Sequence, residues 1–350
     1  MRRGLIARSQ VELPDAALAA RLDRVRAAMQ GAHLDALVIY SNITRPAGAS
    51  WLTAFVPYWS EALLVVPREG PPYLVAALSF RVKTWIERTS RLGEVLHSPR
   101  IGLKAAQQIA AAKSDAVVGI VEFDGLPAGI ADDMREGGAG LAFVDASALF
   151  APLRGKADPA EIALATKAAS IAHRALGDVE SSDKLDAMVA AIERSARNLG
   201  AEEIYIAVAP DLDRDCRLMR IEGAAELGQT FALRATIAYK GTWVRLLRSF
   251  GDPALERQVS IQFSEALAQL PSDRGFLSFR SWLVEGCRTT QPLEPLMGSR
   301  IDKPIPPPPG ALLSVQGVLA VDGRTFVIGA PALTGVDGEA ASLLIEPLYD

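Results

Sequence analysis

The stretch GQTFALRATIAYKGTWVRLLRSF, residues 228–250, decides the fold. Its two halves are rich in aromatic and β-branched residues and flank Lys240-Gly241, a pattern that predicts a β-hairpin. Because side chains in a strand alternate between two faces, Arg234 shares a face with Thr236. The second half carries Arg245. The sequence therefore predicts a central hairpin that presents two arginines.

The composition bounds the class of protein. The chain has 350 residues, of which 49% are hydrophobic and 22% charged, enough apolar material for two domains with cores of their own. Lys and Arg number 37 against 41 Asp and Glu, so the formal net charge is −4, which argues against a nucleic-acid binder. Two cysteines, Cys216 and Cys287, form neither a disulfide framework nor a Cys-x-x-Cys metal motif.

The hydropathy pattern favours a cytoplasmic protein. The N-terminus is basic but lacks the apolar run of a secretory signal. No stretch approaches 18 consecutive apolar residues, so a membrane span is not expected.

Residues 1–150 are expected to form a mixed α/β domain. Apolar side chains recur at helical spacing over residues 15–30, between Pro14 and Gly31. Short apolar runs bounded by Gly, Pro or Asn then predict strands at 34–40, 61–67, 71–78, 117–123 and 141–147, with helices at 79–90 and 101–113.

Residues 151–350 are expected to form a second domain. Asp158, Pro159 and Glu161 have the spacing of a helix N-terminus. Helices are predicted at 159–178, 183–199, 253–270 and near 276–288, and strands at 204–210, 229–240, 242–250, 311–321 and 325–333. The fold class is therefore α+β.

Five segments, taken in order, resemble the creatinase / aminopeptidase P / prolidase family. They are RLDRVRAAMQGAHLDALVIYSNITRPAGASWLTAF (21–55), PLRGKADPAEIALATKAASIA (152–172), ELGQTFALRATIAYKGTWVRLLRSF (226–250), PGALLSVQG (309–317) and FVIGAPALTGVDGEAASLL (326–344). The resemblance implies a creatinase N-terminal-like α/β domain over 1–150 and a pita-bread domain over 151–350. It also implies a homodimer.

The resemblance further implies that the metal site of the family is lost. The family's metal ligands are two Asp, one His and two Glu. The aspartates fall at Arg234 and Arg245, the first glutamate at or beside Gln316, and the second glutamate at Gly329. The histidine belongs in the interval 271–300, which contains none. A guanidinium offers only N–H donors and a fixed positive charge, so it cannot ligate a cation. No metal or other cofactor is expected, nor metal-dependent peptide hydrolysis.

Two interpretations of the arginines stay open. In one, Arg234 and Arg245 hold the carboxylate or phosphate of a small ligand. The other candidates for ligand contact are Arg220, Tyr239, Trp243 and Gln316. In the other interpretation, the arginines form ion pairs with protein carboxylates and the aromatic residues pack. The candidate carboxylates are Asp215, Glu222 and Glu226.

Two functions follow. The first is a non-peptidase that binds a small anionic molecule or serves as the inactive partner of an active relative. The second is a metal-independent hydrolase or lyase acting on a C–N bond of a small carboxylate-bearing metabolite, because creatinase gives the family a precedent for hydrolysis without metal. Arg234 and Arg245 would then orient the carboxylate, with Glu222 or Asp215 as the general base. Neither nucleic acid nor a membrane is an expected partner.

Overall fold

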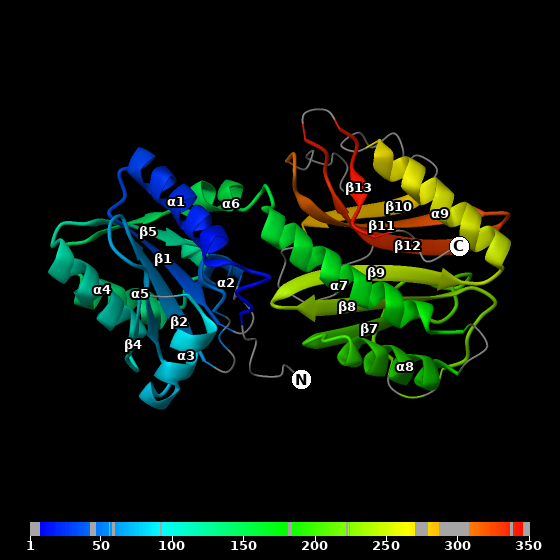
Figure 1. The fold of residues 1–350 in the computed structure, drawn as a ribbon, viewed down its shortest axis with the longest axis horizontal. Coiled ribbons are helices and arrows are strands. Elements are labelled where there is room, and N and C mark those ends of the chain that lie inside the picture. Colours follow the sequence, from blue (N-terminus) through cyan, green and yellow to red (C-terminus); the bar gives the residue numbers. More distant parts are fainter. Residues whose placement is uncertain are drawn as a thin grey trace. The chain divides into compact units, whose positions relative to one another are not determined.

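The computed structural model describes residues 8–42, 47–55, 57, 60–91, 93–180, 184–221, 223, 225–269, 279–286 (backbone), 308–336 and 339–345. The chain divides into two compact units, Arg2–Arg154 and Gly155–Asp350 (Figure 1). The division falls after Arg154, whereas the sequence placed it after residue 150. None of the described helices is both long and apolar enough to cross a membrane.

The N-terminal unit is a sheet with helices on both faces. In the described residues its strands run in the order β4-β3-β2-β1-β5-β6. Leu37 and Ile39 of β1 face a core that includes α1, and Val38, between them, faces a core that includes α4. The elements are α1 (Asp15–Gly31), β1 (Ala36–Ser41), α2 (Ala47–Thr53), β2 (Ala62–Pro67), β3 (Tyr73–Ala76), the 3-10 turn η1 (Phe80–Val82), α3 (Lys83–Thr89), β4 (Glu94–His97), α4 (Ile101–Ala112), β5 (Val117–Val121), η2 (Phe123–Gly125), α5 (Ala128–Gly137), β6 (Ala142–Asp145) and α6 (Ser147–Leu153).

The C-terminal unit is an antiparallel sheet packed by helices. In its described part the strand order is β10-β11-β12-β9-β8-β7, and β13 pairs with β12. The elements are α7 (Pro159–Gly177), α8 (Leu185–Asn198), β7 (Glu203–Ala209), β8 (Phe231–Tyr239), β9 (Thr242–Phe250), α9 (Pro253–Ala268), β10 (Phe279–Gly286), β11 (Leu312–Val321), β12 (Arg324–Leu333) and β13 (Ser342–Leu343).

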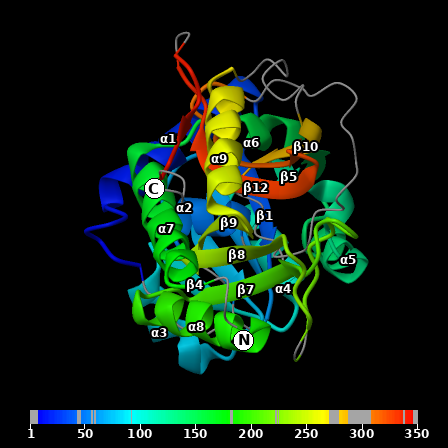
Figure 2. The same ribbon diagram turned by 90° about the vertical axis from the view of Figure 1, so that its right-hand side faces the viewer.

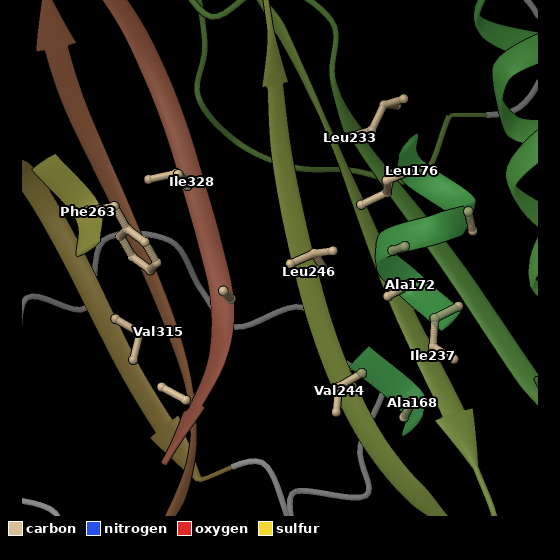
Figure 3. Packing of buried hydrophobic residues seen from close by; sticks show 14 of the residues in the cluster. Ala168, Ala172, Leu176, Leu233, Ile237, Val244, Leu246, Phe263, Val315 and Ile328 are labelled. Carbon is tan, nitrogen blue, oxygen red and sulfur yellow. The ribbon is translucent and has the colours of Figure 1, made fainter. Parts of the chain in front are cut away.

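The helices α7, α8 and α9 cover the same face of this sheet, which we call the helix face (Figures 1 and 2). Leu233 and Ile237 of β8 lie beside α7, near Leu176 and Ala172 respectively, whereas Phe263 of α9 lies near Val315 of β11 (Figure 3). Helix α7 begins as the sequence predicts, because the Asp158 side chain accepts a hydrogen bond from Glu161 N at 2.9 Å in a capping box.

The central hairpin is confirmed. Strands β8 and β9 pair from Phe231↔Phe250 to Tyr239↔Thr242. Lys240 and Gly241 both have positive φ, 48° and 77°, as a two-residue turn of type I′ requires.

One predicted helix is wrong. Within the segment near 276–288 that was predicted as a helix, the described residues 279–286 form strand β10, which pairs antiparallel with β11. Its aromatic and β-branched residues, Phe279, Trp282 and Val284, suit a strand, and the pairing partner lies too far along the chain for local periodicity to indicate it.

The sheet has a narrow seam between β9 and β12. In the described residues these strands share one register pair, Gly329↔Leu247. Next to this pair, the Ser249 hydroxyl donates to Val327 O at 2.6 Å and accepts from Val327 N at 2.9 Å. The Ser249 side chain therefore joins β9 to the backbone of β12.

Candidate functional site

Both arginines of the hairpin project from the face of the C-terminal sheet opposite the helices. Arg234 is in register with Leu247, and Arg245 is in register with Thr236. Residues directly opposite in a ladder share a face. Leu233, next to Arg234, lies in the core under the helices (Figure 3). We call this opposite surface the arginine face.

The two guanidinium groups are buried. Arg234 is 1% exposed and Arg245 is 7% exposed. A carboxylate, Glu203 of β7, is buried on the same face, because Glu203 pairs with Ala238. Among the buried side chains that the structure describes on this face, two cations therefore accompany one anion. A buried guanidinium requires anionic or hydrogen-bonding partners, from the protein or from a ligand.

A row of residues crosses the sheet at the level of Arg234. Leu247 pairs with Arg234 and with Gly329, and Gly329 pairs with Gln316 of β11. Gln316 is 3% exposed. Its Nε2 and Oε1 have no hydrogen-bond partner in the described part of the chain. The row therefore places a buried neutral amide on the same face as the arginines.

An aromatic pair lies beside Arg245. Trp243, two residues earlier on β9, is tilted by 31° against Tyr205, with ring centroids 5.7 Å apart. The indole Nε1 of Trp243 is buried without a hydrogen-bond partner among the described residues. The Tyr205 hydroxyl donates to Glu203 Oε2 at 3.4 Å.

The segment after β7 closes one end of the arginine face. Leu212 and Leu218 pack against Leu247 and Val318 in an apolar cluster. Cys216 is half-buried at this cluster, with its Sγ 3.6 Å from Leu212 O. These contacts place an apolar cluster at Leu247, which lies between Arg234 and Gln316 in the row.

The structure places Arg234, Arg245, Trp243 and Gln316 on one face of the sheet. It does not bring Tyr239 to them, because Tyr239 is five positions along β8 from Arg234 and therefore packs on the helix face. Arg220 differs from the two buried arginines, because its side chain is exposed.

Arg248 also belongs to the helix face. It lies three positions after Arg245 on β9, and its Nη1 donates to Leu176 O of α7 at 3.2 Å. Arg248 is therefore close to Arg245 in the sequence but lies on the opposite face of the sheet.

The carboxylates expected near the arginines are placed differently. Asp215 forms an ion pair with Arg217 at 2.7 Å, and the hydrogen bond from Arg217 lowers the pKa of Asp215. Glu226 is exposed, and Glu222 lies outside the described residues. In place of these the structure has Glu203, which the sequence prediction did not include. Glu203 and Tyr205 on β7 are two positions apart, as are Ser314 and Gln316 on β11. This alternation is the sequence signal that the two members of each pair share a face of the sheet.

Within the described ranges, no group of three or more His, Cys, Asp or Glu side chains is arranged to hold a metal ion. The interval 271–300, where the resemblance places a histidine ligand, is described only at strand β10.

Comparisons with known proteins define the class. Residues 21–155 match the Creatinase/Prolidase N-terminal domain. No curated protein matches the chain. Among solved structures, the prolidase from Pyrococcus furiosus is 14% identical, with a TM-score of 0.64, over 93% of this chain and 99% of that one.

Two further structures agree over similar lengths. The Xaa-Pro dipeptidase from Bacillus anthracis is 16% identical, with a TM-score of 0.67, over 93% of this chain and 97% of that one. The X-Pro aminopeptidase from Thermotoga maritima is 14% identical, with a TM-score of 0.68, over the same shares. Likeness at such identities shows the fold alone.

The chain is therefore a two-unit α+β protein with the pita-bread fold of these peptidases. Its N-terminal unit contains a creatinase/prolidase N-terminal domain, and the fold that the resemblance to the creatinase / aminopeptidase P / prolidase family predicts is confirmed.

Proposed function

We propose that this protein binds a small anionic molecule on the arginine face and has lost metal-dependent peptidase activity. The observation that carries the proposal is the burial of Arg234 and Arg245 on one face of the sheet. A guanidinium binds carboxylate or phosphate oxygens with two parallel hydrogen bonds, and such bonds are strongest where water is excluded.

The side chains present do not fit the dinuclear metal site that the fold family implies. The positions that the resemblance assigns to metal-binding carboxylates carry Arg234, Arg245, Gln316 and Gly329. Two of these are fixed cations on the same face, one is a neutral amide and one has no side chain. A divalent cation placed among them would meet positive charge rather than anionic oxygen.

The remaining polar groups favour an anion of modest size. Trp243 contributes an indole N–H donor next to Arg245. Leu212 and Leu218 fill the end of the face toward Val318. The arginines and the Trp243 N–H would bind one carboxylate or phosphate, and the apolar side chains beside them favour a ligand with a short carbon skeleton.

The metal-independent C–N hydrolase has less support. Asp215 is bound to Arg217, which lowers its pKa and makes it a weak base at neutral pH.

Thermal unfolding in the presence of small acids tests the proposal. Phosphate, succinate and succinamate are added to the wild type, to Arg245→Met and to Arg220→Met, an exposed arginine that serves as the control. At least one acid is expected to raise the Tm of the wild type and of Arg220→Met by several degrees, and to leave Arg245→Met unchanged.

Metal analysis tests the other half of the proposal. The purified protein is incubated with Mn²⁺ or Zn²⁺, dialysed, and assayed for bound metal and for cleavage of Ala-Pro. The proposal predicts neither stoichiometric metal nor cleavage. Stoichiometric metal together with turnover would refute it.

The proposal includes a homodimer in the cytoplasm, either alone or as the inactive partner of an active relative. Light scattering on the purified protein and cell fractionation test these two points. Co-purification with a peptidase of the same fold would favour the partner role.

A further inference from the structure

We propose that Gln316 is a specificity residue of the anion site, which selects acids that carry an amide or ureido group close to the carboxylate. The inference rests on the proposed function, because it assigns the second recognition point of the same ligand.

The first observation is that the amide of Gln316 is buried and unsatisfied. Neither its Nε2 nor its Oε1 has a hydrogen-bond partner in the described ranges, although the residue is almost fully buried. Buried polar groups in folded proteins are nearly always paired, since an unpaired group has lost its water without replacement. A ligand that reaches this amide would supply the missing partners.

The second observation gives the direction of the side chain. Gln316 is in register with Gly329, and a Cβ added to Gly329 would lie 2.7 Å from Gln316 Cγ. The Gln316 Cγ therefore lies beside Gly329, on the side of β11 that faces β12. Arg234 stands further along the same row.

The register gives the separation of Gln316 and Arg234 along this row. Gln316 and Arg234 are separated by three strand intervals, on the order of 14 Å between their backbones. Leu247 and Gly329 occupy the two positions between them in the row. A ligand that contacts both Gln316 and Arg234 would therefore lie across Leu247 and Gly329.

The third observation is that Gln316 has unsatisfied neighbours. Ser314, two residues earlier on the same face of β11, is buried, and its Oγ has no partner within the described chain. The Nε1 of Trp243 on β9 is also buried and has no hydrogen-bond partner among the described residues. Hydrogen-bonding groups without partners therefore recur on both sides of the seam.

The chemistry of a glutamine side chain selects the ligand group. Its amide offers a donor and an acceptor side by side in one plane. A second amide or a ureido group offers the matching acceptor and donor. A ketone accepts from Nε2 but gives nothing to Oε1, and a carboxylate places negative charge against Oε1. Because an unpaired buried group weighs heavily against the wrong ligand, the discrimination is expected to be strong.

Calorimetric titration with a matched pair of acids tests the inference. Succinamate and levulinate have the same skeleton, and differ in that an amide NH₂ in the first is a methyl group in the second. Malonamate with acetoacetate, and glutaramate with 5-oxohexanoate, repeat the comparison at shorter and longer spacing. The proteins are the wild type, Gln316→Met, Gln316→Asn and the exposed control Gln258→Met.

At the spacing that binds best, the wild type and Gln258→Met are expected to favour the amide acid by about 10-fold or more. Gln316→Met is expected to bind both acids of the pair alike. Gln316→Asn keeps the amide on a shorter side chain and is expected to lose most of the preference. Circular dichroism confirms that each variant folds.

The outcomes separate the two proposals. If the wild type binds acids that Arg245→Met does not bind, but shows no preference within any pair, the assignment of Gln316 is overturned and the anion site stands. The same holds if Gln316→Met retains the preference. If no acid in the panel binds the wild type, and phosphate and succinate do not bind either, both proposals are overturned.

Discussion

Arg248 Nη2 lies 3.7 Å from Glu256 Oε2 beneath the helices of the C-terminal unit. Glu256 Oε1 also accepts a hydrogen bond from Gly251 N at 2.7 Å, and Arg248 donates to Leu176 O. The pair thus connects β9 to α7 and to the first turn of α9. Burial nevertheless dominates at Glu256 and raises the pKa of its carboxyl group, although Gly251 and Arg248 oppose the shift.

The stability of the wild type relative to Glu256→Gln is expected to fall as the pH rises. A carboxyl group whose pKa in the folded state lies above its ordinary value of 4.5 contributes stability that is fully present below that value. This contribution is lost as the pH rises through the folded-state pKa. Urea unfolding of both proteins between about pH 4 and pH 7 measures the difference. Glu265→Gln, exposed on the same helix, is the control and should run parallel to the wild type. The prediction is contradicted if the free energy of unfolding of the wild type increases relative to that of Glu256→Gln as the pH rises.

Gln316→Met is expected to stabilise the protein. Methionine has a similar length and removes a buried amide that lacks partners among the described residues. The gain in the free energy of unfolding should be about 1–3 kcal/mol, the usual penalty of an unsatisfied buried polar group. Gln258→Met on the exposed side of α9 should stay within about 0.5 kcal/mol of the wild type. Chemical denaturation of both proteins without ligand measures this difference. A loss of stability in Gln316→Met would mean that the amide of Gln316 has hydrogen-bond partners in the wild type.

Gly329→Ala is expected to destabilise the sheet. The new Cβ would lie 2.9 Å from Val315 O as well as against Gln316, and the backbone oxygen cannot move aside as a side chain can. The loss should be about 1–3 kcal/mol. Gly129→Ala in α5 is the matched control, because a Cβ there meets nothing within 4 Å and alanine favours a helix by up to about 1 kcal/mol. Equal unfolding midpoints for the two variants would argue against the close packing at Gly329.

Asp158→Ala is expected to weaken helix α7. The carboxylate of Asp158 caps the helix by accepting from Glu161 N at 2.9 Å, and alanine leaves this amide without its side-chain partner. The cost should be about 1 kcal/mol in unfolding free energy. Asp23→Ala, on an exposed position of α1, removes the same charge without a cap and should change stability by less than about 0.5 kcal/mol.

Local patterns in the sequence predict much of the fold. The hairpin follows from a turn at Lys240-Gly241 between two alternating runs, and the start of α7 follows from its capping residues. Strand β10 does not follow, because its pairing with β11 involves residues from a distant part of the chain. Closeness to the turn suggests Tyr239 as a ligand contact, although its position in the alternation with Arg234 assigns it to the helix face.

The candidate site depends on register, which one sequence does not specify. That Arg234 and Gln316 share a row is a consequence of three successive strand pairings, each fixed by packing across the whole sheet. The unsatisfied state of the Gln316 amide is likewise a property of its surroundings. The identities of the residues could be predicted, but their arrangement on one face required the structure.

The seam between β9 and β12 gives the arginine face a line of weak backbone pairing, with Arg234 on one side and Gln316 on the other. If the proposed ligand contacts both side chains, it connects the two halves of the sheet across this line. The amide protons of Val327 and Gly329 should therefore exchange with solvent more slowly when the ligand is bound. Their exchange rates would then measure the fraction of protein that holds the ligand.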